Sequence, residues 1–413
     1  MDLLRFITAG SVDDGKSTLI GRLLYDSKNI LIDQLEALER STKNRIDGSV
    51  DLALLTDGLR AEREQGITID VAYRYFSTSR RKFIIADAPG HVQYTRNMIT
   101  GASNADLIII LIDARNGITE QTRRHSIIAS LLGIQQVIVA VNKMDLVNFA
   151  EESYNKICFD YSAIARELGL KKIQFIPISA LNGDNVVDAS SLMKWYEGET
   201  LLQMLENISI EQNIDLKRSR LPIQYVIRPQ TKEWHDYRGY AGTISSGVYR
   251  KNDLVKILPS RLTTTIRSIA INGKEVDEAF AGQSVVLQLN DNIDISRGDC
   301  IVVASELPKV ESSIDVLLCW MDAKPLQREK KYLLQHNTRI VTAVIEEISY
   351  RLNVNTLEKE FFVEEIFQNE IVMAKIKLSG PIAYDSYREL KTNGKAILID
   401  ATSNTTAGAC IIQ

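Results

Sequence analysis

Residues 1 to 207 alternate short apolar runs with amphipathic stretches of helical spacing. The runs are continuous in Ile, Leu and Val, which is typical of strands buried on both faces of a parallel sheet. Helical patterns such as residues 121–132 and 154–168 lie between them and create a strand–helix–strand series. We therefore predict an α/β domain whose mostly parallel sheet carries helices on both faces, with strands at residues 3–9, 83–86, 107–112, 137–141 and 173–178.

The pattern changes after a polar segment at residues 209–220. From Leu221 onward the apolar runs are short, alternate with polar positions, and are interrupted by Gly, Asn and Asp, as expected for antiparallel barrels. Tight turns are predicted at residues 239–247, 272–273 and 291–295, and one weak helical pattern covers residues 356–361. Because Pro308 interrupts residues 305–312, we place a second boundary there. The predicted domains are an α/β P-loop domain at 1–208 and two all-β barrel domains at 219–306 and 310–413.

Composition and charge restrict the class of protein. The 413 residues are 45% hydrophobic and 25% charged, which is ordinary for a globular protein. The net charge of −4 lacks the basic surplus that gripping a nucleic-acid backbone requires, and we interpret the basic run at 324–331 as a solvated loop. The four cysteines form no C-x-x-C pair, and the N-terminus does not resemble a signal peptide. We expect a cytoplasmic protein without nucleic-acid or membrane partners.

A phosphate-binding loop follows the first predicted strand. Residues 10–17 fit the motif G-x-x-x-x-G-K-[ST]. They lead into a predicted helix at residues 17–25, which is the context that this motif requires. Lys16 is expected to reach the β- and γ-phosphates, and the Ser17 hydroxyl to bind Mg²⁺. The loop residues predicted to bind nucleotide are Gly10, Ser11, Val12, Asp13, Asp14, Gly15, Lys16, Ser17 and Thr18.

Three further motifs follow later strands in the order expected of a GTP site. In the first, Asp87 is expected to hold Mg²⁺ and Gly90 to offer its N–H to the γ-phosphate. In the second, the Asp145 carboxylate is expected to accept both guanine N–H groups, which adenine lacks. The third is expected to offer a backbone N–H to guanine O6. The motifs are Asp87, Ala88, Pro89, Gly90 and His91; Asn142, Lys143, Met144 and Asp145; and Ser179, Ala180 and Leu181.

Hydrolysis is predicted from three residues. Lys16 is expected to act on the phosphates, Thr68 to bind Mg²⁺ and sense the γ-phosphate, and His91 to orient the attacking water. The long segment before Thr68 is expected to include a helix at 31–38. We interpret the remaining histidines, His125, His235 and His336, as ordinary polar residues.

This motif set resembles the translation-factor class of P-loop GTPases, which carries a GTPase domain followed by two barrels. Within that class, several stretches are similar to the GTPase (large) subunit of bacterial sulfate adenylyltransferase. Elongation factors usually carry His where this chain has Asp14. The stretches are GSVDDGKSTLIGRLL (10–24), AEREQGITID (61–70), QYTRNMITGAS (93–103), QTRRHSIIASLLG (121–133) and YRGYAGTISSG (237–247).

The resemblance implies a GTPase subunit of a nucleotidyltransferase. In that family a separate small catalytic subunit converts ATP and sulfate to adenosine 5′-phosphosulfate and diphosphate, and GTP hydrolysis by the large subunit drives this reaction. The implied assembly is a heterodimer or a higher-order assembly of heterodimers, with GTP and Mg²⁺ as ligands. Two alternatives remain open: an elongation factor that delivers aminoacyl-tRNA in a GTP-dependent manner, and a regulatory switch GTPase.

Overall fold

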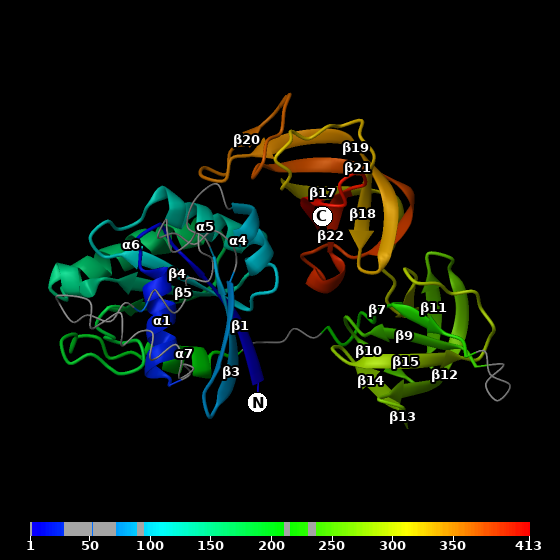
Figure 1. The fold of residues 1–413 in the computed structure, drawn as a ribbon, viewed down its shortest axis with the longest axis horizontal. Helices are drawn as coiled ribbons and strands as arrows, with labels where there is room; N and C mark the ends of the chain where they lie inside the picture. Colours follow the sequence, from blue (N-terminus) through cyan, green and yellow to red (C-terminus); the bar gives the residue numbers. More distant parts are fainter. Residues whose placement is uncertain (1, 29–51, 53–71, 89–94, 210–214, 230–236) are drawn as a thin grey trace. The chain divides into compact units, whose positions relative to one another are not determined.

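The computed structural model describes residues 2–28, 52, 72–88, 95–209, 215–229 and 237–413 (Figure 1). The chain divides into two compact units, one of residues 1–211 with 354–357 and the other of residues 212–353 with 358–413. We describe each unit by itself. The predicted helix at 31–38 lies outside the described residues, and the bounds of the three predicted domains stay predictions.

The first unit contains a six-stranded sheet in the order β2-β3-β1-β4-β5-β6. The β2–β3 pair is antiparallel and all other pairs are parallel, so the predicted mostly parallel sheet is confirmed. All seven residues of β4 are buried, as its continuous apolar run predicts. The strands are β1 (Asp2–Ala9), β2 (Ala72–Ser77), β3 (Arg81–Asp87), β4 (Leu107–Asp113), β5 (Gln136–Asn142) and β6 (Lys172–Pro177).

Helices cover both faces of this sheet, as predicted. Figure 1 shows α1 and α7 on one side and α4, α5 and α6 on the other, and residues of α1 and α7 share one hydrophobic core with the strands. Capping boxes at Thr119 and Thr200 satisfy N–H groups at the starts of α5 and α7. The helices are α1 (Lys16–Asp26), α4 (Thr95–Ala102), α5 (Glu120–Leu131), α6 (Glu151–Glu167) and α7 (Leu201–Asn207), with a short 3₁₀ helix, η3 (Met144–Val147). None of the described helices is long and apolar enough to cross a membrane.

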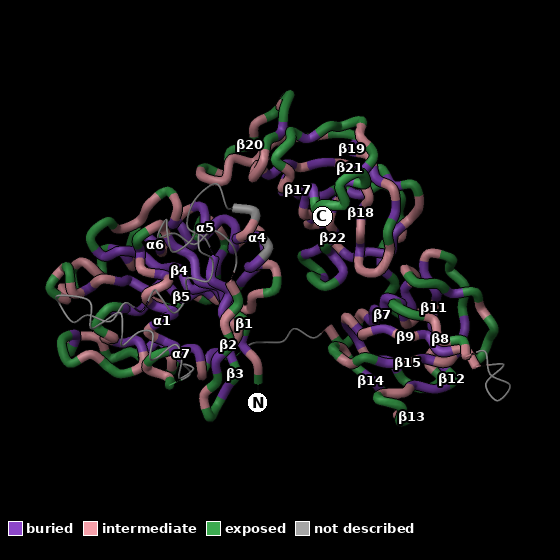
Figure 2. The backbone as a smooth tube through the Cα atoms, in the orientation of Figure 1, coloured by how far each residue is buried: buried purple, intermediate pink, exposed green. Residues whose placement is uncertain are grey.

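The second unit begins with an eight-stranded antiparallel sheet in the order β7-β16-β11-β12-β15-β9-β8, with β13 paired to β12. A separate β10–β14 pair adds to it, and buried apolar side chains from these strands form one core (Figure 2). The strands are β7 (Leu221–Pro222), β8 (Tyr225–Ile227), β9 (Gly239–Thr243), β10 (Val248–Arg250), β11 (Leu254–Leu258), β12 (Leu262–Ile271), β13 (Lys274–Val276), β14 (Glu278–Phe280), β15 (Ser284–Leu289) and β16 (Cys300–Val303).

The last part of the chain forms a closed β-barrel. Its sheet runs β18-β22-β23-β17-β21-β19-β20, and an additional β18–β19 pairing closes the ring. Closure leaves no unpaired edge among the six ring strands, and their inward side chains pack around Trp320. The strands are β17 (Lys309–Trp320), β18 (Tyr332–His336), β19 (Arg339–Leu352), β20 (Lys359–Glu360), β21 (Ile371–Tyr384), β22 (Lys395–Asp400) and β23 (Thr406–Ile412), with a 3₁₀ helix, η5 (Lys391–Asn393).

Local predictions in the β-rich part had mixed outcomes. Asn272 and Gly273 form a tight turn between β12 and β13, and both have positive φ, 50° and 78°, as this turn type requires. Residues 324–331 form a loop, as expected. The weak helix at 356–361 was wrong: Arg351 pairs with Glu360 across β19 and β20, and a six-residue helical pattern is too short to outweigh strand pairing.

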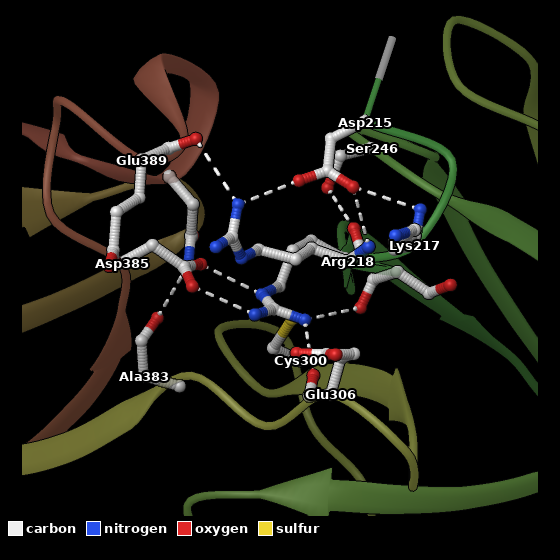
Figure 3. A network of polar contacts seen from close by, with 12 residues as sticks. Asp215, Lys217, Arg218, Ser246, Cys300, Glu306, Ala383, Asp385 and Glu389 are labelled. Atoms are coloured by element: carbon white, nitrogen blue, oxygen red, sulfur yellow. Dashed lines mark hydrogen bonds and ion pairs between the residues drawn. The ribbon is translucent and has the colours of Figure 1, made fainter.

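A buried ion pair lies within the second unit. The guanidinium of Arg220, just before β7, donates from Nε and Nη2 to the two carboxylate oxygens of Asp385, just after β21, with both bonds at 2.8 Å. Nη1 donates to the carbonyls of Ser219 and Glu306, and Asn393 donates to Asp385 at 2.7 Å (Figure 3). The Arg220 side chain is only 1% exposed. Neither charge can be left alone without a large desolvation cost.

Asp385→Ala is expected to destabilise the second unit by about 3–5 kcal/mol, because it leaves the buried guanidinium without its counter-ion. The expected fall in melting temperature is about 10 °C, at roughly 2–4 °C per kcal/mol for a unit of this size. Glu278→Ala is the matched control, since the Arg250–Glu278 pair is 61% and 58% exposed. Equal melting temperatures for the two variants would contradict a stabilising role for the buried pair.

Candidate functional site

The parallel sheet brings the predicted motifs to one edge. Gly10 follows β1, Asp87 is the last residue of β3, and Asn142 is the last residue of β5. Because these strands run in the same direction and neighbour one another through β4, their carboxyl ends meet at a single edge. Loops at this edge of an open α/β sheet are where ligands bind.

Gly15 could not be replaced by another residue without rearrangement. Its φ of 92° lies in the left-handed region, and a Cβ atom here would lie 2.5 Å from Nδ2 of Asn142. The residue after it, Lys16, opens α1, so the first N–H groups of this helix point toward the loop. Such a helix N-terminus favours an anion. Ser17 and Thr18 are half-buried on the first turn of α1, Val12 is half-buried in the loop, and Asp13 is exposed.

The Lys16 ammonium is held inside the loop. Its Nζ donates to the carbonyl oxygens of Gly10 at 3.0 Å and Ser11 at 2.8 Å. Burial lowers the pKa of Lys16, and the carboxylates of Asp87, Asp14 and Asp13 oppose this shift. Two of the three ammonium N–H groups are used by these carbonyls, so the third is available to a phosphate oxygen.

Asp14 contributes its side chain to the loop, which the sequence did not predict. Its carboxylate accepts the Ser11 N–H at 2.5 Å and is only 3% exposed. Burial raises the pKa of Asp14, with the Ser11 N–H and the Lys16 ammonium opposing the shift. The carboxylate therefore stabilises the loop's curled backbone from within.

Oxygen ligands suited to Mg²⁺ are present at this edge. Asp87 is 2% exposed and accepts a hydrogen bond from the Thr8 hydroxyl at 3.2 Å, while Ala88 beside it is also buried. Across the described residues, no group of three or more His, Cys, Asp or Glu side chains could hold a metal ion. Mg²⁺ rarely uses an all-protein cage, and it normally combines one or two protein oxygens with phosphates and water. A set of Asp87 and Ser17 fits that preference.

Asn142 joins the phosphate loop to the loop after β6. Its Nδ2 donates to the Asp14 carbonyl at 2.7 Å, and its Oδ1 accepts the Ala180 N–H at 2.9 Å. The side chain is 2% exposed, so both bonds are protected from water. One amide thus sets the distance between the two loops.

Asp145 is oriented by a neighbour from the third motif. The hydroxyl of the fully buried Ser179 donates to Oδ1 of Asp145 at 2.7 Å. The backbone N–H of Met144, itself buried, donates to the Ile178 carbonyl at 3.2 Å. The Ser179 bond fixes one carboxylate oxygen, and within the described residues the other oxygen accepts no hydrogen bond and is left for a ligand.

The N–H groups of the third motif are partly occupied. The Ser179 N–H donates to the Asp184 carbonyl, and the Ala180 N–H donates to Asn142. Within the described residues, Leu181 is the member of the motif whose N–H has no acceptor, and its side chain is 55% exposed. Arg22 of α1 also holds this loop, because its guanidinium donates to the carbonyls of Ala180 and Leu181.

Some predicted site residues lie outside the described residues. These are Thr68, Pro89, Gly90 and His91, so their roles stay predictions. His235 also lies outside.

The sequence analysis missed three contributors near the site. The Thr119 hydroxyl, which caps α5, lies 2.8 Å from the Ser11 hydroxyl. His125, which the sequence analysis interpreted as an ordinary polar residue, lies on α5 and is only 4% exposed. Asp113 closes β4 and pairs with Lys143. The sequence shows Asp113 at the end of an apolar run, which could have pointed to this residue. The burial of His125 depends on tertiary packing, which the sequence does not show.

Two family models match this chain. The model of the Elongation factor Tu GTP binding domain matches residues 1–211, and the GTP-eEF1A C-terminal domain-like model matches residues 313–413. Sup35 complexed with GMPPNP, a solved structure, aligns with a TM-score of 0.45 at 22% identity over 100% of this chain and 93% of that chain, a score that supports no conclusion. The first match alone defines the class: this is a P-loop GTP-binding protein of the elongation factor Tu type.

Curated relatives give the family. The chain is 53% identical to sulfate adenylyltransferase subunit 1 of Aliarcobacter butzleri, covering 100% of this chain and 87% of that protein. It is 53% identical to the protein of the same name from Laribacter hongkongensis, covering 100% and 85%. It is 50% identical to the bifunctional enzyme CysN/CysC of Rhodopirellula baltica, covering 99% and 63%. The chain belongs to the sulfate adenylyltransferase subunit 1 family, and the resemblance stated from the sequence is confirmed.

The Asp145→Asn variant is expected to prefer xanthine nucleotides, whereas the wild-type protein is expected to prefer guanine nucleotides. The amide would offer an N–H to the O2 of xanthine, whereas the carboxylate pairs with the N1–H and amine of guanine. Titration with GDP and xanthosine diphosphate would measure this, and we expect GDP affinity to fall about 100-fold or more. Retention of the preference for GDP would show that Asp145 does not read the base.

The buried His125 is expected to make the first unit sensitive to acid. Burial, with Lys16 and Arg124 nearby, lowers the pKa of His125 from 6.5 to about 3, so the fold favours the neutral ring. This stabilisation is complete above pH 6.5 and is lost toward pH 3 at about 1.4 kcal/mol per pH unit, or about 2 kcal/mol by pH 5.

Urea unfolding of wild type and His125→Gln between pH 7.5 and 5 measures this contribution. The wild-type stability of the first unit should fall more steeply than that of the variant, whatever their difference at pH 7.5. His336→Gln, a change in the second unit, is the control and should leave the slope of the first unit unchanged. Parallel slopes for wild type and His125→Gln would contradict a buried, neutral ring.

Proposed function

We propose that this chain is the GTP-hydrolysing subunit of a sulfate adenylyltransferase. It couples GTP hydrolysis to the synthesis of adenosine 5′-phosphosulfate and diphosphate from ATP and sulfate, the first step of sulfate assimilation. The ATP and sulfate chemistry takes place on a separate small catalytic subunit. The observation that carries this proposal is the identity of 53% over the full chain to relatives named sulfate adenylyltransferase subunit 1.

The site geometry supports the nucleotide part of the proposal. Lys16 is buried inside a glycine-bearing loop, and one of its ammonium N–H groups is left for a ligand. Asp145 is oriented by Ser179, and its second carboxylate oxygen is left for a ligand. The first arrangement suits a phosphate chain, and the second suits the N–H pair of guanine. Because Asn142 connects the two, one ligand of the length of GTP would contact both.

Each site residue has a role in this proposal. Lys16 contacts the β- and γ-phosphates, and Leu181 donates its N–H to guanine O6. Ser17, Thr68 and Asp87 hold Mg²⁺, which neutralises phosphate charge when bound. Gly90 donates its N–H to the γ-phosphate, and His91 orients the attacking water. The α1 N-terminus and the Lys16 ammonium stabilise the negative charge that develops on the phosphates during phosphoryl transfer.

The energy coupling has a chemical reason. The phosphosulfate anhydride is unfavourable to form from ATP and sulfate, so a second, favourable hydrolysis must be tied to it. The word "subunit" in the relatives' names supports a partner chain, and we propose a heterodimer or an assembly of heterodimers. The relatives described above carry the names of sulfate-activating enzymes rather than of translation factors, so delivery of aminoacyl-tRNA is not favoured.

The direct test measures GTP hydrolysis and adenosine 5′-phosphosulfate together. The purified chain is assayed with ATP and sulfate, with and without the proposed small catalytic subunit. We expect the partner to raise phosphate release by at least about tenfold and the product to accumulate beyond the amount formed without GTP.

His91→Ala is the matched control, since it is expected to bind GTP but hydrolyse it at least about 100-fold more slowly. The mixture with this variant should form product only to the level reached without GTP. A mixture in which hydrolysis and product are unrelated would contradict coupling. Stimulation by aminoacyl-tRNA and ribosomes instead of the partner would move the function to translation.

A further inference from the structure

A buried carboxylate with two cationic partners lies at the end of β4. Asp113 is 2% exposed, and its Oδ2 lies 3.0 Å from Nζ of Lys143. The side chain of Arg115 donates to both carboxylate oxygens, at 3.1 Å from Nε to Oδ1 and at 2.7 Å from Nη2 to Oδ2. The Arg115 backbone N–H adds a bond to Oδ1 at 2.9 Å. Four donors therefore fix the orientation of this carboxylate.

Lys143 is constrained at both ends. Its backbone has a φ of 63°, a left-handed conformation that costs of order 1 kcal/mol or more for a residue with a side chain. Its ammonium is bound to Asp113, and the side chain is 23% exposed. A lysine side chain has several rotatable bonds and carries about 2 kcal/mol of rotamer entropy when free. The ion pair therefore restricts the Lys143 side chain to conformations that reach from its loop to Asp113 at the end of β4.

Asp113 enters this ion pair as a carboxylate. Burial alone would raise the pKa of Asp113, but hydrogen bonds from Arg115 and Lys143 outweigh it and hold the pKa at about 2. Asp113 is thus an anion throughout the neutral range. Arg115, whose side chain is 48% exposed, and Lys143 both contact Oδ2 of this carboxylate.

We propose that Asp113 is a positioning residue for the nucleotide base, and that it acts by holding Lys143 along the face of guanine. The inference rests on the proposed placement of guanine beside Asn142, Lys143 and Asp145. Asp145 reads the edge of the base by hydrogen bonding, whereas Lys143 contacts its face through its methylene chain. Asp113 therefore raises affinity for a nucleoside without deciding which base is preferred.

Calorimetric titration of nucleotide-free protein with GDP tests this placement. Asp113→Asn keeps the size of the side chain but weakens its hold on the ammonium, and we expect GDP affinity to fall about tenfold. Lys143→Met should lose a similar factor. The double variant should lose no more than the larger single loss, because each change breaks the same contact.

Two ligands and two control variants separate positioning from general damage. Inorganic triphosphate occupies the phosphate loop but lacks a base, so its affinity should be unchanged in Asp113→Asn. Xanthosine diphosphate should remain as disfavoured relative to GDP as in wild type. Arg115→Gln should lose less GDP affinity than Asp113→Asn, since the Lys143 bond persists. Glu167→Gln, which neutralises the surface carboxylate 2.8 Å from Arg123, should match wild type for every ligand.

The outcomes are distinct. Wild-type GDP affinity in Asp113→Asn would overturn the inference, as would multiplicative losses in the double variant or an equal loss of triphosphate affinity. Should Asp113→Asn melt at a much lower temperature, Lys143→Met gives the same test from the more exposed end of the pair. Failure of the wild-type chain to bind GDP would instead overturn the guanine site itself, and with it the proposed function.

Discussion

The nucleotide site depends on the buried amide of Asn142. This one side chain accepts from the loop after β6 and donates to the phosphate loop after β1, and both bonds are shielded from water. The close approach also explains Gly15, where a Cβ atom would collide with the amide. In the proposed site, phosphate and base recognition therefore share one geometry, which is set by the spacing of strands in a parallel sheet.

Around this amide, charged groups are buried in pairs or networks. Lys16 is bound by loop carbonyls, Asp14 by a loop N–H, and Asp113 by Arg115 and Lys143. The second unit uses the same rule at Arg220, whose guanidinium donates four hydrogen bonds, two of them to Asp385. Since an unpaired buried charge costs several kcal/mol, each network specifies the positions of its members more than it adds to net stability.

Much of the fold could be predicted from the sequence because local patterns and tertiary environment agree. The continuous apolar run of β4 is buried on both faces, and the Asn272-Gly273 turn has the positive φ values that its composition implies. The antiparallel edge strand β2 was not predicted, since it lacks an apolar run and depends on pairing with β3. The helix at residues 356–361 was wrong because pairing between β19 and β20 outweighs a weak local preference.

The sequence by itself determined the class of protein, because a glycine loop and polar residues at strand ends, such as Asp87 and Asn142, can serve guanine-nucleotide chemistry only in a restricted order along the chain. It also indicated the family, which the relatives confirm. Only the tertiary structure decided that Asp113 meets Lys143 across two strands and that His125 is buried and neutral. Those properties come from contacts between residues distant in sequence, and no local pattern encodes the distance between two side chains.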